Sequence, residues 1–247
     1  MAKKFTEKYT IPYYDCDSEG MLKVPMLIKM MIRTSSNQSN SLGVNDRLLK
    51  QFNVNWIITQ HDLQITDLPK VNDDIYITTQ AESYNKYFCY RRFWLHDSNN
   101  NELASMESTF ALMDISTRKV HAVPDEIIAP FDSEKIKRIK RGENIPKLHE
   151  DNINRSFDAS FWDIDDNHHV NNATYPAWMM DSLSYDFLIN HQPTRVMIKF
   201  NKEIRYGESV QSIVEKTDEL KTIHQIKSGD ILCAEGLIQW GKRLINS

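Results

Sequence analysis

An internal repeat is the feature that most constrains how this chain folds. Within the 247 residues, Tyr14-Asp15-Cys16-Asp17 matches Trp162-Asp163-Ile164-Asp165, and Met31 matches Met179 at the same offset of 148 residues. So few matched positions are weak evidence when taken alone. The match gains weight because the predicted secondary structure also follows the same order in both copies.

The first copy consists of a strand, one long amphipathic helix and then a run of strands. Apolar residues recur at helical spacing over residues 24–38, whereas the later segments are rich in β-branched and aromatic residues. Turn-prone runs of Asn, Asp and Ser separate these later segments. The predicted strands cover residues 7–16, 54–65, 73–83, 86–97 and 103–114.

The second copy repeats this order after a less hydrophobic stretch over residues 130–154. A strand pattern again precedes a helical one, which covers residues 171–190, and further strand patterns follow. The predicted strands cover residues 155–163, 194–204, 208–217, 221–229 and 231–241.

A helix packed on an antiparallel sheet, present twice, makes an α+β fold with a pseudo-two-fold axis. We therefore expect a first unit over residues 1–130, a linker over residues 131–153 and a second unit over residues 154–247.

The composition argues against several classes of function. The chain has only 7 glycines and no closely spaced run of them, so a nucleotide or other cofactor is not expected. Cys16, Cys89 and Cys233 lie far apart, which argues against a disulfide framework and a zinc site. A net charge of −4 argues against general attraction to nucleic acid. Neither a signal peptide nor a membrane span is apparent, so we expect a cytoplasmic protein.

The two copies differ at a polar cluster before the second helix. Asp165, Asn167 and His169 occupy alternating positions, which point to one side of an extended segment. The first copy has Met21, which cannot carry a proton, in place of His169. A histidine beside a carboxylate and an amide is suited to acid–base chemistry, and N–H groups at the following helix start can stabilise an oxyanion. We therefore expect the chemistry in the second half.

Two other interpretations of this cluster remain open from spacing alone. Asp and Asn before a helix are common N-caps, and Asn171 and Asn172 would serve equally well. Asp165 and His169 lie four residues apart, as two metal ligands can, but no further cluster of His, Cys or acidic residues completes a site. Spacing therefore does not separate catalysis from capping, and no metal is expected.

A longer motif gives these residues a context. The segment from Trp162 to Asn172, followed by Tyr175 and Trp178, resembles the pattern W-x-D-L-D-x-N-x-H-V-N-N-x-x-Y-x-x-W of the acyl-acyl carrier protein thioesterases. The resemblance extends over nearly the whole chain, from Tyr9 through the last strands. It implies a tandem double hotdog, in which each unit is an antiparallel sheet wrapped around one long helix. It also implies a thioester hydrolase of fatty acid biosynthesis that releases fatty acid from acyl carrier protein (ACP).

The resemblance also implies roles for individual residues. The family's catalytic Asp, Asn and His fall on Asp165, Asn167 and His169. A second family motif, an apolar strand that ends in Glu-Cys, places the catalytic Glu at Glu203. This chain has Ile204 instead of the Cys, so a covalent Cys–His mechanism at that position is excluded.

We therefore expect direct attack by water, with Glu203 as general base. His169 and Asn167 would orient the water or contact the substrate, and Asp165 would fix one of these side chains. Helix N–H groups near Val170 would polarise the thioester carbonyl. Without the resemblance, Glu203 would be interpreted as a surface carboxylate paired with a neighbouring base.

The first half is then free to hold the acyl chain. Methionine adapts to flexible apolar ligands, although plain core packing is the alternative for each candidate. The expected substrate-binding residues are Met26, Met30, Trp56 and Val170.

The implied partner is ACP, a small acidic protein that carries the acyl chain on a phosphopantetheine arm. A basic run in the linker would speed the encounter by electrostatic steering, although such a run is also typical of a solvated surface. The residues of this basic run are Lys135, Lys137, Arg138, Lys140 and Arg141.

Two other functions remain open: a hotdog thioesterase that acts on acyl-CoA, and a noncatalytic acyl-binding hotdog protein. Retention of the catalytic set counts against the second. Exposed sheet edges also leave a homodimer possible.

Overall fold

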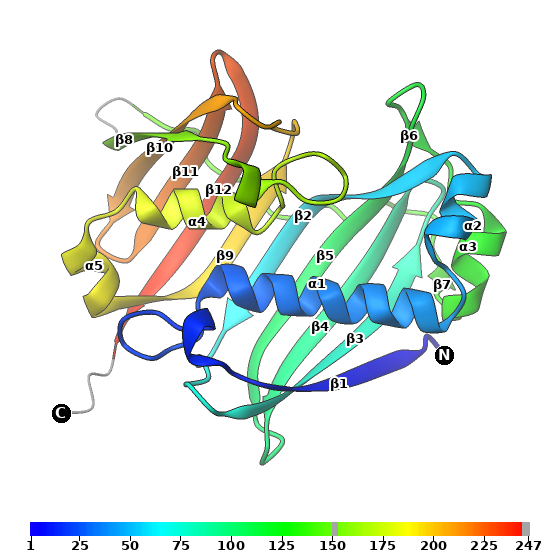
Figure 1. Ribbon diagram of the computed structural model, residues 1–247, viewed down its shortest axis with the longest axis horizontal. Coiled ribbons are helices and arrows are strands. Elements are labelled where there is room, and N and C mark those ends of the chain that lie inside the picture. Colours follow the sequence, from blue (N-terminus) through cyan, green and yellow to red (C-terminus); the bar gives the residue numbers. More distant parts are fainter. Residues whose placement is uncertain (150–152, 244–247) are drawn as a thin grey trace.

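The computed structural model describes residues 1–149 and 153–243. Residues 150–152 of the predicted linker and residues 244–247 of the predicted second unit lie outside the described residues. Figure 1 shows one strongly curved sheet with the two main helices lying across the same face.

The first half follows the predicted order, with one long helix between strands. Helix α1 (Val24–Ser41) has Pro25 in its first turn, where a missing N–H costs nothing, and it ends before Gly43 at a φ of +78°. The strands are β1 (Lys4–Thr10), β2 (Val54–Ile65), β3 (Asp74–Tyr84), β4 (Phe88–Asp97), β5 (Glu102–Asp114), β6 (Val120–His121) and β7 (Glu134–Lys135). Short helices are η1 (Tyr13–Asp15), α2 (Asp46–Gln51), α3 (Asp125–Ile128) and η2 (Ala129–Phe131).

The second half contains two short helices where the sequence predicts one over residues 171–190. Ser182 donates its hydroxyl to the Trp178 carbonyl at 2.9 Å, and the Ser184 hydroxyl accepts from the Phe187 N–H at 3.3 Å. Serines compete for backbone groups in this way, so they favour a helix end and a new N-cap. The elements are β8 (Ile153–Asp158), η3 (Phe161–Asp163), α4 (Thr174–Asp181), α5 (Tyr185–Asn190), β9 (His191–Phe200), β10 (Ser209–Asp218), β11 (Lys221–Ser228) and β12 (Ile231–Lys242).

The strands of both halves form one sheet in the order β1-β3-β4-β5-β2-β9-β12-β11-β10-β8. The strand order of the second half is the mirror image of that of the first, so β2 corresponds to β9 and β1 to β8. Antiparallel pairing of β2 with β9 forms the junction, and its register is centred on Asp62 opposite Met197. The strands at the two ends of the path are β1 and β8. The predicted α+β fold, an antiparallel sheet around a helix in each half, is confirmed.

The larger of two apolar clusters among the described residues lies between the sheet and both helices. Met31 of α1 and Met179 of α4, the matched pair of the repeat, are both 0% exposed and belong to one cluster that spans the halves. Fully burying such a side chain contributes about 1.5–3 kcal/mol. The core therefore ties the two halves together.

Both halves build the same turn before their main helix. In each, a short 3₁₀ helix leads into a β-bridge that encloses a residue in the left-handed region. The pairs related by 148 residues are Tyr13–Asp15 with Phe161–Asp163, the bridge Cys16–Leu22 with Ile164–Val170, and Gly20 (φ +75°) with His168 (φ +64°). The offset found in the sequence is thus the structural repeat.

The connecting segment between the halves crosses the outer face of the sheet, opposite the helices. It starts at β7, which pairs with β3. The Lys140 N–H then donates to the Tyr90 hydroxyl at 2.9 Å, and Glu143 accepts from Arg195 of β9 at 2.8 Å. Tyr90 alternates along β4 with Arg91, which bonds to α1, so Tyr90 faces outward.

Candidate active site

Asp165 organises the turn that carries the predicted catalytic residues. Its Oδ1 accepts from the Asn167 N–H at 3.0 Å, and its Oδ2 accepts from Asn171 Nδ2 at 3.3 Å. The Asp165 N–H donates to the His169 carbonyl at 2.9 Å. Burial raises the pKa of Asp165, and the hydrogen bond from Asn167 opposes that shift. These contacts are local to the turn, so Asp165 positions its neighbours.

His169 and Glu203, two of the predicted catalytic residues, are in direct contact. His169 Nε2 lies 3.0 Å from Glu203 Oε2, and each side chain is 22% exposed. Burial lowers the pKa of His169, whereas the Glu203 charge opposes this shift. A lowered pKa keeps the imidazole mainly neutral at pH 7. Two separate segments, the turn before α4 and the loop after β9, thus bring these side chains together, and their catalytic roles stay predictions.

Two further residues come from the first half and were missed by the sequence analysis. Arg118, in the turn after β5, donates from Nη2 to Glu203 Oε2, the oxygen that also faces His169. Asn55 at the start of β2 donates from Nδ2 to Asn167 Oδ1 at 3.5 Å. Arg205 of the second half contacts Glu203 Oε1 at 3.3 Å. The site is therefore built by both halves.

The first half has neither a histidine nor a glutamate at the positions equivalent to His169 and Glu203. Met21 replaces His169 at the repeat offset. The Leu22 N–H donates to the Pro69 carbonyl as the Val170 N–H does to that of Ile204, so buried Leu68 stands where Glu203 does. An oxygen of Asp17 is bound instead by Arg243 at 2.6 Å.

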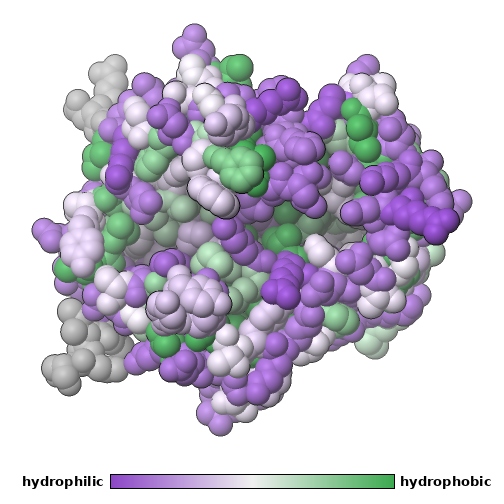
Figure 2. Space-filling model, in the orientation of Figure 1, coloured by the Kyte–Doolittle hydropathy of each residue, from purple (hydrophilic) through white to green (hydrophobic). Residues whose placement is uncertain are grey.

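A cavity of about 460 Å³ runs from the His169–Glu203 pair into the first half. Figure 2 shows a hollow with apolar residues at its base on the face that carries the helices. Some residues that line the cavity are exposed to solvent, and they mark its open end. Others are buried, and they mark its inner end. At the exposed end are Lys29, Asn55, Arg118, Asn167 and Lys202, and at the inner end are Ala81, Cys89, Arg91, Ile128 and Phe131.

Two of the four predicted substrate residues line this cavity. Trp56 of β2 and Val170 lie in its wall, and Trp56 packs edge-on against Phe110 at 6.2 Å between ring centroids. The α1 residues that face the cavity include Ile28 and Ile32 instead of Met26 and Met30. Positions two residues apart on a helix lie about 200° apart around its axis, so the methionines point the other way. Met30 is 8% exposed and belongs to the core.

The predicted docking residues lie on the connecting segment, whereas the cavity opens on the helix face. Lys135 lies over the Tyr84 ring at 5.7 Å, and Lys140 over the Tyr90 ring at 5.3 Å. Lys140 also contacts Glu82 at 3.3 Å. The other members, Lys137, Arg138 and Arg141, are exposed. Their role in docking stays a prediction.

The cysteines offer no nucleophile beside the pair. All three are buried, and only Cys89 lies in the cavity wall, at its inner end. Burial raises the pKa of Cys89 to about 12. Within residues 1–149 and 153–243, no group of three or more His, Cys, Asp and Glu side chains is arranged to hold a metal ion. Nor does any helix of this part of the chain have the length and apolarity to cross a membrane.

A main helix packed on an antiparallel sheet in each half, with the strand order of one half the mirror image of the other, defines a tandem hotdog protein. The chain belongs to the acyl-ACP thioesterase family. Family models match it over residues 2–131 (acyl-ACP thioesterase N-terminal domain) and residues 146–242 (acyl-ACP thioesterase C-terminal domain).

Solved structures share the fold over the whole chain. A putative oleoyl thioesterase from Lactobacillus plantarum is 32% identical, with a TM-score of 0.93 over 98% of this chain and 97% of that one. The 12:0-ACP thioesterase from Umbellularia californica is 17% identical, with a TM-score of 0.87 over 97% of this chain and 98% of that one.

Curated relatives are plant enzymes. The chloroplastic oleoyl-acyl carrier protein thioesterase 1 of Arabidopsis thaliana is 23% identical over 87% of this chain. The chloroplastic acyl-acyl-carrier-protein hydrolase FATB3 of Cuphea viscosissima is 24% identical over 85% of this chain. The chain spans 65% and 54% of the length of these two relatives.

Proposed function

We propose that this protein hydrolyses fatty acyl thioesters of acyl carrier protein, releasing free fatty acid and holo-ACP. The observation that carries the proposal is the position of the His169–Glu203 pair at the exposed end of a cavity that extends into the first half. Apolar side chains such as Ile28, Ile32 and Trp56 line the middle of that cavity and suit an acyl chain. Membership of the acyl-ACP thioesterase family supports the same reaction.

The proposed nucleophile is water, and Glu203 is its general base. Glu203 Oε2 faces both His169 and Arg118. Among the described residues Oε1 has only Arg205 as a partner, an exposed residue with 67% of its side chain accessible. A carboxylate oxygen can accept two hydrogen bonds, so Oε1 retains a lone pair for the water. General-base assistance contributes typically about 10²–10⁴-fold in rate.

His169 orients the base in this mechanism. A neutral imidazole has one N–H, and Nε2 faces the Glu203 carboxylate at 3.0 Å, so that N–H is at Nε2. The hydrogen bond holds Glu203 in place while leaving Nδ1 to accept from the substrate or from water.

The donor for the carbonyl oxygen differs from the one expected from the sequence. The Val170 N–H is engaged by the Ile204 carbonyl at 2.8 Å, so it cannot polarise a thioester. Asn167 is the better candidate, because it lines the exposed end of the cavity and its Oδ1 accepts from Asn55, while its Nδ2 donates to no group among the described residues. One such donor is worth about 10²–10³ in rate.

The chemical step follows from these roles. Water oxygen attacks the thioester carbon as Glu203 accepts its proton, and Asn167 stabilises the resulting oxyanion. Collapse of the tetrahedral intermediate breaks the C–S bond, and the phosphopantetheine thiolate leaves and takes up the proton. The free fatty acid remains in the cavity until it dissociates.

Two surfaces are available to an acidic carrier protein. The exposed end of the cavity itself presents Lys29, Arg118 and Lys202, whereas the basic run of the connecting segment lies away from it. Charge reversal of Lys29 and Lys202, compared with reversal of Lys137 and Arg138, identifies which surface the carrier uses. We place the reaction in cytoplasmic fatty acid biosynthesis, a location that cell fractionation would test.

Release of free thiol tests the function directly. We expect hydrolysis of acyl-ACP by the wild type and its loss in His169→Ala, with acyl-CoA substrates of the same chain as a comparison. Preference for acyl-CoA would move the assignment to the alternative carrier. If folded protein releases no thiol from any thioester yet binds fatty acid, the protein is an acyl-binding hotdog instead of an enzyme.

A further inference from the structure

The inner end of the cavity contains a buried cation, Arg91, that pairs with no carboxylate in the described part of the chain. Arg91 lies on the inner face of β4 between Cys89 and Phe93, where the sequence alternation predicts an apolar side chain. It is 8% exposed and lies over the Phe131 ring at 5.2 Å. Within the described residues, no ion pair involves it. Burial lowers the pKa of Arg91 to about 10, so it remains protonated at neutral pH.

Only one edge of this guanidinium is used by the protein. Nη1 donates to Gln38 Oε1 and to Thr79 Oγ1, the latter at 3.1 Å, whereas Nε and Nη2 donate to no group in the part of the chain that the structure describes. The Nε–Nη2 edge is the fork that Arg195 uses to bind both oxygens of Asp62, at 2.9 and 2.7 Å. In Arg91 that fork is not among the fully buried atoms without a partner, and Arg91 lines the cavity, so a molecule that enters the cavity can reach it.

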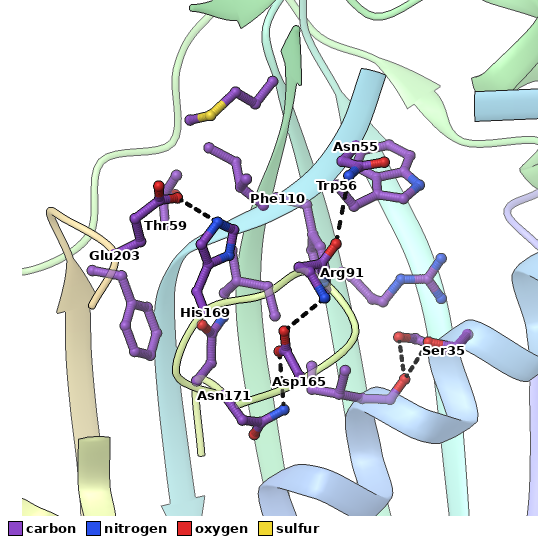
Figure 3. A pocket seen from close by; sticks show the side chains of 18 of the residues that line it. Ser35, Asn55, Trp56, Thr59, Arg91, Phe110, Asp165, His169, Asn171 and Glu203 are labelled. Atoms are coloured by element: carbon purple, nitrogen blue, oxygen red, sulfur yellow. Dashed lines mark hydrogen bonds and ion pairs between the residues drawn. The ribbon is translucent and has the colours of Figure 1, made fainter. Parts of the chain in front are cut away.

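Arg91 lies across the cavity from the reacting centre. Figure 3 shows Glu203 and His169 on one side of the view and the Arg91 guanidinium on the other. Asn55 of β2 contacts Asn167 in the turn before α4. In the sheet, β5 separates β4 from β2. The backbone of β4 therefore lies two strand spacings, about 10 Å, from that of β2, so Arg91 lies on a different strand of the cavity wall from the one that contacts this turn.

We propose that Arg91 sets the upper limit of acyl-chain length, because a longer chain would cover its free Nε–Nη2 edge with methylene groups that accept no hydrogen bond. Water in the cavity satisfies this edge when the chain stops short of it. Displacing that water leaves a buried charged donor without a partner. This inference rests on the proposed function and names the residue that limits its substrate.

The test is kcat/KM over a series of even-numbered saturated acyl-ACP substrates. For the wild type we expect a steep fall beyond one limiting length. In Arg91→Met, kcat/KM for the next longer chains should rise by about 10- to 100-fold, the penalty that the unsatisfied donors otherwise impose. The matched control is Arg92→Met, because Arg92 is the neighbouring arginine on the outer face, where it faces Glu82 and Glu107. The control should keep the limit of the wild type.

A second pair of variants separates charge from size and from folding. Arg91→Lys retains the cation on a smaller head, so it should keep the limit, whereas a purely steric limit would move in both variants. Gln38→Met combined with Arg91→Met removes both partners of the buried hydrogen bond and protects the fold from an orphaned amide oxygen. This double variant should show the same extended range.

Three results would overturn the inference: an unchanged limit in folded Arg91→Met, an equal extension in Arg91→Lys, or a clear preference for chains of limiting length that end in a carboxylate. The last would make Arg91 a carboxylate-binding residue. Dissociation constants of free fatty acids, measured by calorimetry for the same variants, do not depend on turnover. If the limit moves in binding while no variant hydrolyses a thioester, the proposed function fails and the length limit stands.

Discussion

At the scale of single residues, Arg118 shows how a site is completed from far along the chain. It lies 85 residues before Glu203 and shares that carboxylate with His169. Its charge lowers the pKa of His169 in addition to burial, so it favours the neutral imidazole of the proposed mechanism. No local motif marks this arginine in the sequence, since its importance arises only from the pairing of the two halves.

Removing Arg118 should therefore change the titration of His169. In Arg118→Met we expect the pKa of His169 to rise toward its ordinary value, because a cation no longer opposes protonation while Glu203 still favours it. Histidine NMR titration measures this shift, and kcat should fall by about tenfold or more as the base loses its position. Arg205→Met, which removes the more exposed partner of Glu203, is the control and should shift His169 less. An unmoved His169 titration would contradict this account.

At the residue scale, the sequence was informative where the motif was contiguous. Asp165, Asn167 and His169 lie in one turn, and Glu203 follows an apolar strand, so a family pattern can find them. The roles of these residues stay predictions until variants are assayed. Asn55 and Arg118 lie in no such motif. Arg91 sits in an apolar alternation, and only its contacts with α1 show that it faces the cavity.

At the scale of elements, the strands were largely predictable because alternation and β-branched residues persist along them. β2, for example, covers Val54–Ile65, the predicted range. The orientation of α1 was not predictable in the same way. Its apolar residues occupy more than one face, since Met30 packs into the core while Ile28 and Ile32 face the cavity. The packing of α1 on the sheet determines which of its apolar faces lines the cavity.

The turn before α4 gives a prediction at this scale. His168 adopts a φ of +64°, whereas the equivalent residue of the first half is Gly20 at +75°. Glycine adopts this conformation without steric cost, so His168→Gly should raise the free energy of unfolding by roughly 0.5–1 kcal/mol and leave kcat intact. Urea denaturation measures the first quantity. Loss of turnover in this variant would show that His168 takes part in the chemistry.

At the scale of the whole molecule, the continuous sheet and shared core should make the halves unfold together. Met31 and Met179 lie in one apolar cluster, and β2 pairs with β9 across the junction. We expect urea transitions followed by tryptophan fluorescence and by far-UV circular dichroism to coincide. Two separated transitions would mean that the junction is weaker than its packing indicates.

Acid should weaken the whole molecule through two buried histidines. Burial lowers the pKa of both His61 and His224 to about 3, so the folded protein holds them neutral where the unfolded chain would protonate them. Their contribution is complete above pH 6.5 and is lost progressively as pH falls toward 3. At pH 5, each of these histidines lowers the free energy of unfolding by about 2 kcal/mol relative to its value above pH 6.5. Urea denaturation at pH 7 and pH 5 measures the loss, which should be smaller in His224→Leu than in the exposed control His149→Gln. Equal losses would contradict the assignment.

The mirror-ordered sheet has a consequence for how such a chain diversifies. The predicted catalytic residues all lie after residue 160, whereas the residues at the inner end of the cavity lie before residue 132. If the proposed function holds, substitutions in the first half can change which acyl chain is accepted without altering the predicted catalytic residues of the second half. Chimaeras that exchange the first halves of two relatives should then take acyl-chain preference from one parent and kcat from the other. This requires that the pairing of β2 with β9 at the junction is preserved.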